Sequence, residues 1–332
     1  MTETGAPRNA AVADAAAPTI AVLVPCYNEE ATVAKVVGDF QTALPGAEIH
    51  VYDNNSTDRT SEIAASAGAI VGFEGLAGKG NVVRRMFSDV EADIYVLVDG
   101  DATYSSEMAP QLIAMLTEKH LDMVVGARVS EEAESYRFGH RFGNLAFTSL
   151  VAWIFGNRFT DLFSGYRVFS RRFVKTFPAL STGFEIETEL TVHALELNMP
   201  IGEIETPYLA RPEGSTSKLN TIRDGIRILY TIVMMLRDER PLATFGLTGL
   251  LLVLLSVILA VPLVSEYLAT GLVPRLPTAI LCTGMMLLGW LSCFCGLTLE
   301  SLRLGRREAK RLAYLATDGV SALKRRASKK LQ

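Results

Sequence analysis

Two acidic residues end a short apolar run in the first third of the chain. The run DIYVLVDGD predicts a buried strand, and Asp99 and Asp101 flank Gly100 at its end. Ligands bind at strand ends in α/β sheets, and two carboxylates spaced i and i+2 there suit a hard divalent cation that also ligates phosphate oxygens. A solvated turn has the same D-x-D pattern. The position before a helix start at Ser105 or Ser106 favours the cation site.

A second polar cluster follows another predicted strand. Residues 51–58, VYDNNSTD, place short polar side chains such as Asp53 and Asn55 where they can hydrogen-bond a nucleobase and a ribose. An ordinary helix cap by Ser56 or Thr57 explains the same cluster. Both interpretations fit this segment.

A glycine-rich loop with one lysine follows. In GLAGKGN, residues 75–81, the glycines allow close approach of the backbone, and Lys79 supplies a point charge for a phosphate. The loop lacks the GxxxxGK[ST] spacing. A P-loop nucleotidase is therefore disfavoured.

The elements that must position these residues alternate between strand and helix patterns. Between Thr19 and about Ala210, strand-like runs (IAVLVPCY, EIHVYD, AIVGF, DIYVLVDGD, DMVVGAR) are separated by helical segments such as EEATVAKVVGDF and PQLIAMLTEK. This alternation predicts an α/β domain with a mostly parallel, buried sheet. Residues 1–17 are rich in small residues without an apolar core stretch, so we expect a disordered leader and not a secretory signal.

The composition changes at Pro241. Residues 242–264 and 276–299 carry no charge, and each run exceeds the roughly 20 apolar residues that a helix needs to cross a bilayer. Two buried core helices are the alternative. The short connection 265–275 predicts a transmembrane hairpin, residues 241–300.

Basic residues flank this hairpin on both outer sides. Arg237 and Arg240 precede it, and residues 300–332 hold ten Lys/Arg against three acids, whereas the connection holds one Arg and one Glu. The positive-inside rule places both termini and the α/β domain in the cytoplasm. We expect residues 301–332 to form a basic cytoplasmic tail that favours anionic lipid.

An amphipathic pattern precedes the hairpin in residues 218–240. Apolar side chains recur there at a spacing of three or four: Leu219, Ile222, Ile226, Leu229, Val233 and Leu236. This pattern predicts a juxtamembrane helix. It can lie in the membrane interface or pack on the α/β domain.

Composition excludes several classes of protein. The chain has 332 residues, 49% hydrophobic and 20% charged, which is too apolar for a disordered protein and too charged for a polytopic transporter. Its four cysteines show neither paired zinc spacing nor a disulfide framework. A reducing compartment is the simpler interpretation.

Six segments, taken in order, carry a family resemblance. VLVPCYNEEATV, VYDNNSTDRT, GKGNVVRR, DGDATY, DLFSGYRVFSR and RPEGSTSKL resemble glycosyltransferase family 2, and within it the dolichol-phosphate mannose/glucose synthase branch of polyprenyl-phosphate glycosyltransferases. The resemblance covers about residues 19–240. It implies a Rossmann-like GT-A domain over residues 18–217 that moves a hexose, with inversion, from a nucleotide-diphosphate sugar to a polyprenyl phosphate.

The resemblance also implies roles on the donor side. Asp99 and Asp101 would hold Mg²⁺ or Mn²⁺, with Asp101 the more direct ligand. Asn54 stands where many members have a second acid, which leaves the choice between uridine and guanosine open. Arg211 and Lys218, in a stretch similar to an RxxGxSK loop, would close over the donor phosphates. The implied donor contacts are Pro25, Asn28, Glu29, Asp53, Asn55, Lys79, Asp99, Gly100, Asp101, Arg211 and Lys218.

On the acceptor side, the resemblance assigns the lipid phosphate to Arg128 and Arg141, for which a solvated basic surface is the alternative. Asp161 matches the aspartate regarded as catalytic in this branch. Glu187 is the reserve candidate, because other members place a carboxylate base in this stretch; helix-start acids that stabilise the dipole are the alternative. On a helix, Glu185 and Glu189 share a face that Glu187 does not.

Acceptor chemistry bears on these roles. A phosphate monoester has a second pKa near ~6, so at neutral pH it is already a dianionic nucleophile. Asp161 would then orient and not abstract a proton, whereas a hydroxyl acceptor would need a positioned base.

Other functions remain open to a family member. One is transfer to a lipid or glycan hydroxyl, although a processive polysaccharide synthase is disfavoured because no QxxRW-like motif is present. Another is a catalytically silent membrane scaffold, against which the intact polar set argues. A transporter would need charges within its spans. We expect a multi-pass protein of the cytoplasmic (inner) membrane that binds no nucleic acid, and two spans per chain leave room for a homo-oligomer.

Overall fold

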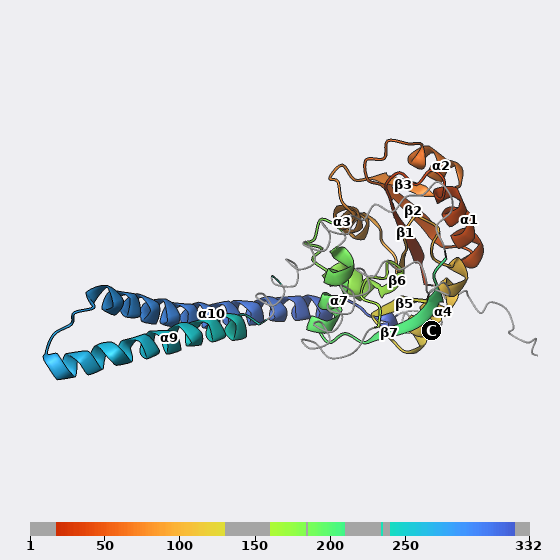
Figure 1. Ribbon diagram of the computed structural model, residues 1–332. Helices are drawn as coiled ribbons and strands as arrows, with labels where there is room; N and C mark the ends of the chain where they lie inside the picture. Colours follow the sequence, from red (N-terminus) through yellow and green to blue (C-terminus); the bar gives the residue numbers. More distant parts are fainter. Residues whose placement is uncertain (1–17, 130–159, 184, 210–233, 235–239, 323–332) are drawn as a thin grey trace, which may run out of the picture. The chain divides into compact units, whose positions relative to one another are not determined.

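The computed structural model describes residues 18–129, 160–183, 185–209, 234 and 240–322. The chain divides into two compact units. One unit comprises residues 1–219 together with 311–332, and the other comprises residues 220–310. Figure 1 labels the helices and strands of both units. The first unit contains the α/β sheet and all the described residues that the sequence singles out for chemistry.

The first unit is built on one mixed sheet of seven strands. Every pairing in the sheet is parallel except the two pairings that β6 makes with β4 and β5. The expectation of a mostly parallel α/β sheet is therefore confirmed. The strand order is β3-β2-β1-β4-β6-β5-β7, with β1 Ile20–Cys26, β2 Glu48–Asp53, β3 Ile70–Phe73, β4 Ile94–Leu97, β5 Met123–Val129, β6 Arg167–Ser170 and β7 Ile201–Pro207.

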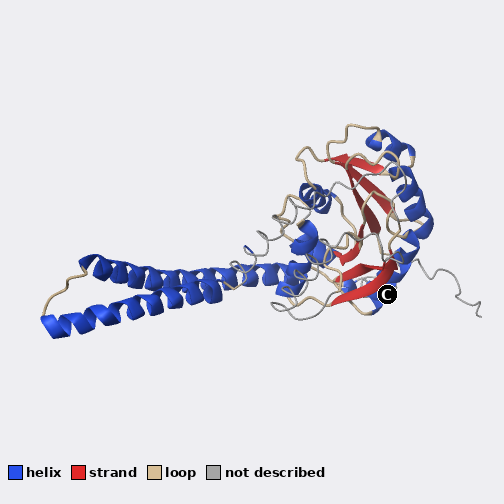
Figure 2. Ribbon diagram, viewed as in Figure 1, coloured by secondary structure: helices blue, strands red, loops and turns tan. Residues whose placement is uncertain are grey.

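Helices cover both faces of this sheet (Figure 2). One layer holds α1 Val33–Ala43, α2 Thr60–Ser66, the 3₁₀ turn Ser106–Met108 and α4 Ala109–Glu118. The other layer holds α3 Lys79–Asp89, α6 Arg171–Thr176 and α7 Ile186–Glu196. The helix predicted to start at Ser105 or Ser106 begins with the 3₁₀ turn, and the α-helix itself starts at Ala109. Pro110 lies in the first turn of α4, where proline is well tolerated.

Alternating side chains of the strands fill two cores. Val22 and Val24 belong to the core beneath α1 and α4, together with Phe40 and Leu112. On the opposite face, aromatic rings pack edge to face or stacked, with Phe169 and Phe173 4.6 Å apart between ring centroids. Burial of both faces accounts for the near-continuous apolar strands of the sequence.

The reversed direction of β6 positions the site. Because β6 runs antiparallel to both β4 and β5, its first residue lies at the edge where β4 and β5 end. The loop that precedes β6, residues 160–166, therefore lies beside the segments that follow β4 and β5. The parallel neighbours β1 and β2 end at the same edge.

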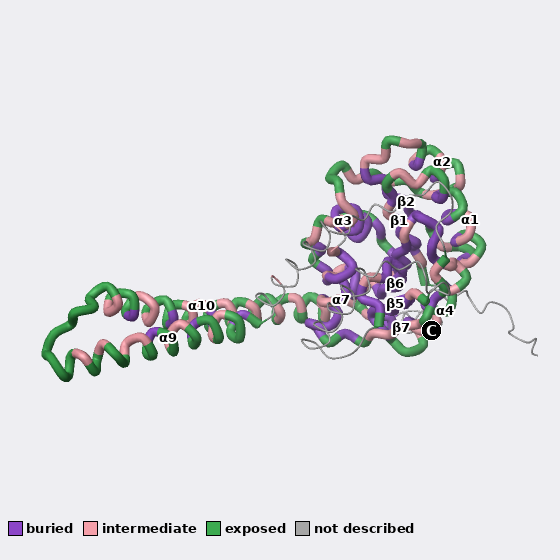
Figure 3. Tube along the Cα trace, in the orientation of Figure 1, coloured by how far each residue is buried: buried purple, intermediate pink, exposed green. Residues whose placement is uncertain are grey.

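The second unit contains one long apolar helix and most of a second, which Figure 3 shows mostly exposed along their length. They are α9 Pro241–Thr270 and α10 Leu276–Ala316, and both are long and apolar enough to cross a membrane. Only 11% and 17% of their most apolar windows are buried, which does not fit the alternative of two core helices. Each helix contains its predicted span and continues beyond it. Apart from residues 234 and 240, the segment 218–240 lies outside the described residues.

Small residues let α9 and α10 pack closely. A Cβ on Gly249 would lie 2.6 Å from the Gly289 carbonyl oxygen, so neither position accepts a larger side chain without separating the helices. The Ser256 hydroxyl donates a 2.8 Å hydrogen bond to the Cys282 carbonyl of the facing helix. Small residues and hydroxyl bonds of this kind hold helices together in lipid.

The last described residues belong to the first unit. The end of α10 and the residues up to 322 belong to that unit, and Val320 is buried in the core beneath α1. Tyr314 donates a 2.7 Å hydrogen bond to the fully buried Asp122, and its ring lies 4.0 Å from the Arg172 guanidinium carbon. Of the predicted tail, the residues up to Ala316 continue α10, and residues 323–332 lie outside the described residues.

Candidate active site

The Asp99-Gly100-Asp101 turn follows β4 at the carboxyl edge of the sheet. Asp101 is buried, and its Oδ1 accepts a 2.6 Å hydrogen bond from the Thr103 hydroxyl. Asp99 Oδ1 lies 2.5 Å from Lys79 Nζ. A Cβ on Gly100 would meet Cys26 Sγ at 2.6 Å, so glycine is needed where the turn packs against the end of β1.

The two acids of this turn fit a metal that takes most of its ligands from a substrate. Magnesium is usually bound through one or two carboxylates together with phosphate oxygens and waters. Among the described residues, no group of three or more His, Cys, Asp or Glu side chains is placed to enclose a cation by itself. Asp99 and Asp101 supply two carboxylates, the number that a site shared with phosphate oxygens uses.

Asp53 ends β2, and its carboxylate stabilises the following turn. Oδ1 accepts from the Ser56 backbone N–H at 3.0 Å and Oδ2 accepts from the Ser61 hydroxyl at 2.9 Å. The end of β1 is tied to the same turn, because the Thr57 N–H donates to Asn28 Oδ1 at 2.7 Å. The helix cap expected at Ser56 or Thr57 is wrong, because α2 begins at Thr60 with Arg59 as its N-cap residue and no side-chain cap, and the polar cluster instead stabilises the turn before the helix.

Further bonds fix the segment after β1. The Glu29 N–H donates to the Thr60 hydroxyl at 2.8 Å, and Asn28 adopts a left-handed backbone with a φ of 54°. Pro25 lies within β1, in register with Tyr52 of β2. Hydrogen bonds therefore connect the segment after β1 to the segment after β2.

Asn54 holds the glycine-rich loop in place. Its side-chain amide donates to the carbonyls of Glu74 and Leu76, at 2.9 and 2.8 Å, and its Oδ1 accepts from the Gly78 N–H. An aspartate at this position could not donate the first two bonds. Asn55, with a φ of 63°, adds a 3.1 Å bond to the Gly75 carbonyl. The asparagine that departs from the family pattern thus has a structural role that the sequence did not indicate.

The glycines on either side of Lys79 pack closely against the backbone of residues 181–182. A Cβ on Gly78 would lie 2.1 Å from the Thr182 carbonyl oxygen, and one on Gly80 would lie 2.2 Å from that of Ser181. The Gly80 N–H also donates to the Thr182 carbonyl at 3.1 Å. This close packing brings the start of α3 against the turn that precedes α7.

Lys79 consequently bridges two carboxylates. Its Nζ lies 2.5 Å from Asp99 Oδ1 and 2.5 Å from Glu187 Oε1. Burial lowers the pKa of Lys79, but the two carboxylates outweigh burial and raise the pKa above its usual value. Lys79 is therefore a protonated link between α3, the end of β4 and α7.

The acids at the start of α7 differ in their surroundings. Glu187 is buried against Lys79, whereas Glu189 accepts hydrogen bonds from the backbone N–H groups of Leu180 and Ser181, at 2.8 and 2.7 Å. Helix geometry predicts that these two side chains diverge, and they do.

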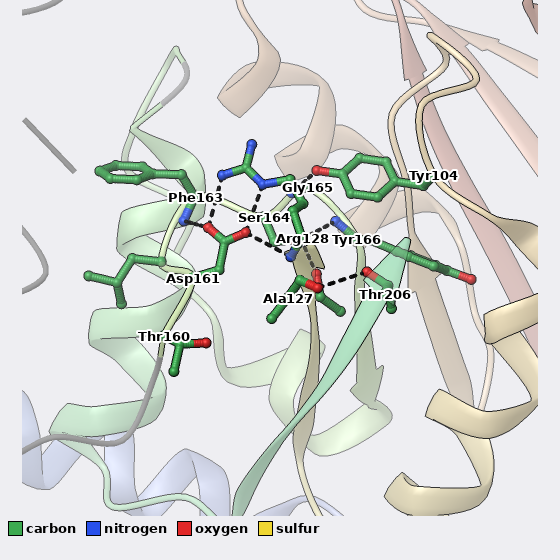
Figure 4. A network of polar contacts seen from close by, with 12 residues as sticks. Tyr104, Ala127, Arg128, Thr160, Asp161, Phe163, Ser164, Gly165, Tyr166 and Thr206 are labelled. Atoms are coloured by element: carbon green, nitrogen blue, oxygen red, sulfur yellow. Dashed lines mark hydrogen bonds and ion pairs between the residues drawn. The ribbon is translucent and has the colours of Figure 1, made fainter. Parts of the chain in front are cut away.

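Asp161 and Arg128 form a bidentate pair at the same edge of the sheet, as Figure 4 shows. Arg128 Nε lies 2.7 Å from Asp161 Oδ2, and Nη2 lies 2.9 Å from Oδ1. Burial alone would raise the pKa of the Asp161 carboxyl, but the hydrogen bonds and charge of Arg128 outweigh burial and hold that pKa below its usual value. Asp161 is an ionised partner that orients a guanidinium.

The Asp161 loop touches the Asp99 turn directly. A Cβ on Gly165 would lie 2.4 Å from Asp99 Oδ2, and the Gly165 N–H donates to the Tyr104 hydroxyl at 2.9 Å. The structure therefore joins the two acidic segments that lie about sixty residues apart in the sequence.

Arg167, at the start of β6, supports this loop from inside the protein. Its fully buried guanidinium donates to the carbonyls of Leu162 and Ser164, at 2.7 and 2.9 Å, and to the Thr191 hydroxyl of α7 at 2.8 Å. Burial lowers its pKa to about 10, although nearby carboxylates oppose the shift. The sequence pattern did not indicate this role for Arg167. An arginine within an apolar strand was the available signal.

The remaining predicted site residues, Arg141, Arg211 and Lys218, lie outside the described residues. The described candidates lie at the carboxyl edge of the sheet, in the loops beside it, or, for Lys79 and Glu187, at the starts of α3 and α7. Among them, Lys79 joins Asp99 to Glu187, and Arg128 pairs with Asp161.

Comparisons with known proteins find glycosyltransferases. A model of the family described as glycosyl transferase family 2 matches residues 21–177. Glycosyltransferase AglJ of Haloferax volcanii is 32% identical over 302 residues, which are 89% of this chain and 98% of the relative. A dolichyl-phosphate hexose transferase of the same organism is 29% identical over 222 residues, 67% of this chain and 95% of the relative.

Solved structures share the fold. Glucosyl-3-phosphoglycerate synthase from Mycobacterium tuberculosis, crystallised with Mn²⁺, UDP and glucosyl-3-phosphoglycerate, superposes with a TM-score of 0.52 at 25% identity. The match covers 65% of this chain and 80% of that structure. The expected GT-A-like fold is confirmed by this similarity.

Proposed function

The chain belongs to glycosyltransferase family 2, and we propose that it transfers a hexose from a nucleotide-diphosphate sugar to a polyprenyl phosphate at the cytoplasmic face of a membrane. One observation carries the acceptor assignment: a guanidinium held by an ionised carboxylate, Arg128 with Asp161, beside the Asp99 turn. The name of the dolichyl-phosphate hexose transferase, to which the chain is similar over two thirds of its length, supports the same acceptor class.

On the donor side, we assign the nucleotide to the surface after β1 and β2, with Asp53 nearest the base. Asp99 and Asp101 would hold Mg²⁺ or Mn²⁺, which supplies positive charge to the donor diphosphate as it leaves. The Mn²⁺ and UDP of the similar synthase support this assignment. The rigid turns around Asp53 and Asn54 keep these contacts in place before the donor binds.

On the acceptor side, binding of the acceptor phosphate by positive charge is more important than proton abstraction by a general base. A phosphate monoester is already dianionic at neutral pH, so it needs binding and alignment and little proton abstraction. The bidentate bond to Asp161 fixes the guanidinium plane of Arg128, and a planar fork of N–H donors matches phosphate oxygens. Asp161, with its lowered pKa, is suited to orient Arg128 and poorly suited to act as a general base.

The two apolar helices fit this acceptor. A polyprenyl chain is insoluble in water, so an enzyme that acts on its phosphate must work at the membrane surface. We propose that α9 and α10 cross the membrane, with the catalytic unit and both termini in the cytoplasm. The short connection between the helices, residues 271–275, would lie on the opposite side.

Gly165→Ala tests the contact between the two acidic segments. The added Cβ would lie 2.4 Å from Asp99 Oδ2, so either the loop or the carboxylate must move. A displacement of about 1 Å in a reacting group can cost a hundredfold, and we expect a loss of about that size in kcat. Gly38→Ala in α1 is the control, because nothing lies within 4 Å of its Cβ position. Unchanged kcat in Gly165→Ala would contradict the close contact.

The pH dependence of transfer tests the acceptor chemistry. We expect the rate to fall below pH ~6, where the acceptor phosphate takes up its second proton. The pKa of Asp161 is lowered from 3.8, so this carboxylate stays ionised well below that range. Asp161→Asn should therefore slow transfer and leave the midpoint of the acid limb unchanged. Loss or displacement of the limb in Asp161→Asn would instead identify Asp161 as a proton acceptor, as a hydroxyl substrate requires.

A further inference from the structure

Glu187 has one carboxylate oxygen that lacks a partner. Its side chain is 6% exposed, and Oε1 is taken by Lys79, but Oε2 is buried without a hydrogen bond to any described residue. A buried carboxylate oxygen without a donor is unfavourable, and native proteins rarely leave one. Such an oxygen beside a candidate active site is typical of a position that a substrate completes.

The carboxylate is also held firmly. Lys79 fixes Oε1, and the Glu187 backbone carbonyl accepts a 3.0 Å hydrogen bond from Thr191, which in turn accepts from Arg167. The close packing of Gly78 and Gly80 against residues 181–182 leaves little freedom for the start of α3. Oε2 is therefore a charged acceptor in a fixed position, and such acceptors discriminate well between ligands.

Its neighbours suggest what the ligand is. Asp99 and Glu187 bind the same lysine nitrogen, so a diphosphate bound at Asp99 and Asp101 would place its attached sugar close to Glu187. Sugar hydroxyls donate strong hydrogen bonds to carboxylates. Free nucleotide diphosphate lacks this sugar.

We propose that Glu187 Oε2 accepts a hydrogen bond from a hydroxyl of the donor hexose, and that Lys79 is the positioning residue that holds Glu187 beside Asp99. This assignment rests on the proposed function for the existence of a sugar donor. It gives both residues roles that differ from the sequence-based expectations, which were a reserve base for Glu187 and a phosphate contact for Lys79. Glu187 then selects the sugar, and Lys79 acts through Glu187 and Asp99.

Binding measurements on the full-length protein in detergent separate these roles. The probes are a nucleotide-diphosphate sugar and its free nucleotide diphosphate, each titrated with Mg²⁺ by calorimetry. The sugar nucleotide is the one that supports transfer or, if none does, UDP-glucose and GDP-mannose in turn. A hydrogen bond to a charged group is worth about ten- to a hundredfold in affinity. We expect Glu187→Gln to weaken the sugar nucleotide at least about tenfold and the free nucleotide less than about threefold.

Donor analogues that lack single hydroxyls identify the contact in the unmodified protein. The analogue that lacks the contacting hydroxyl should bind the unmodified protein at least about tenfold more weakly than the complete donor does. In Glu187→Gln, the same analogue and the complete donor should bind almost equally well, because the substitution and the missing hydroxyl remove the same interaction. If no single deoxy analogue binds more weakly to the unmodified protein, the proposal is overturned even if Glu187→Gln does not fold.

Lys79→Met tests the positioning role. We expect it to weaken the sugar nucleotide more than the free nucleotide, as Glu187→Gln does. An equal loss for both ligands would show that Lys79 contacts the phosphates directly. Lys35→Met, at a lysine whose side chain is 61% exposed, is the matched control. Equal effects of Glu187→Gln on both ligands would indicate that a bound water, and not a sugar, satisfies Oε2.

These outcomes are independent of the acceptor. No lipid is present in the titrations, so a failure to glycosylate polyprenyl phosphate would overturn the proposed function without changing the binding ratios. Conversely, transfer to lipid with unchanged ratios would leave the proposed function intact and refute the role of Glu187.

Discussion

Asp101→Asn is expected to lower transfer about a thousandfold and to leave the fold intact. The substitution removes one negative charge from the pair that would hold the metal and the donor diphosphate, and loss of such electrostatic stabilisation typically costs a hundred- to a thousandfold. The amide keeps the shape of the carboxylate, and its oxygen can still accept the hydrogen bond from Thr103. Turnover at saturating Mg²⁺, beside thermal unfolding, measures both parts of the prediction.

Asp39→Asn is the control for that experiment. Asp39 is an acid of the same unit with a side chain 44% exposed, and its ion pair with Lys35 lies within one turn of α1. Exposed pairs of this kind contribute little, so activity should be unchanged. Retention of more than about a tenth of the activity by Asp101→Asn would contradict the assigned role of the Asp99 turn.

Arg128→Ala is expected to reduce kcat/KM for the lipid phosphate about a hundredfold or more, with donor affinity little changed. The residue would supply the fixed positive charge on the acceptor side. Arg128→Lys should recover only part of the loss, because an ammonium cannot form the planar bidentate bond that Asp161 now makes. Steady-state kinetics at varied polyprenyl phosphate provides the measurement.

A double variant separates this catalytic effect from folding. Arg128→Ala alone leaves the buried Asp161 carboxylate unpaired, which is destabilising by about 3–5 kcal/mol. Arg128→Ala combined with Asp161→Ala removes both charges, and it should recover stability without recovering transfer. Recovery of transfer in the double variant would show that the pair has only a structural role.

The sequence predicted strands β1 to β4 more fully than the other half of the sheet. The apolar runs before Asp53 and Asp99 are long enough to be recognised as strands, and parallel strands must end at one edge. β6 was missed because it is four residues long and begins with Arg167, a residue that is usually exposed. The reversal of the sheet at β6, which brings Asp161 to Asp99, could not be inferred without it.

The partners of individual side chains were harder to predict. Lys79 and Glu187 lie far apart in the sequence and meet only because Gly78 and Gly80 pack against the turn before α7. Glycines allow the backbone to approach either a phosphate or a protein carbonyl closely. The sequence of the loop alone therefore could not show which of the two the loop contacts. Asn54 likewise stood out as a departure from the family pattern, but its hydrogen bonds to the loop depend on the fold.

The ends of the two apolar helices were not predicted from the sequence. The absence of charge in residues 242–264 and 276–299 predicts where the spans are but not where the helices end. α10 continues past its apolar part because the basic residues that follow are good helix formers. The contact of Tyr314 with Asp122 depends on a tertiary arrangement that no local pattern predicts.

The most direct test of the account is transfer itself. Membranes that contain the protein would receive polyprenyl phosphate, Mg²⁺ or Mn²⁺ and a panel of labelled UDP- and GDP-sugars, with Asp101→Asn membranes in parallel. We predict label in the organic phase from one donor, released by mild acid and absent with Asp101→Asn. Nucleotide release without organic-phase label, or label in a product stable to mild acid, would contradict a phosphate acceptor and direct attention to a hydroxyl.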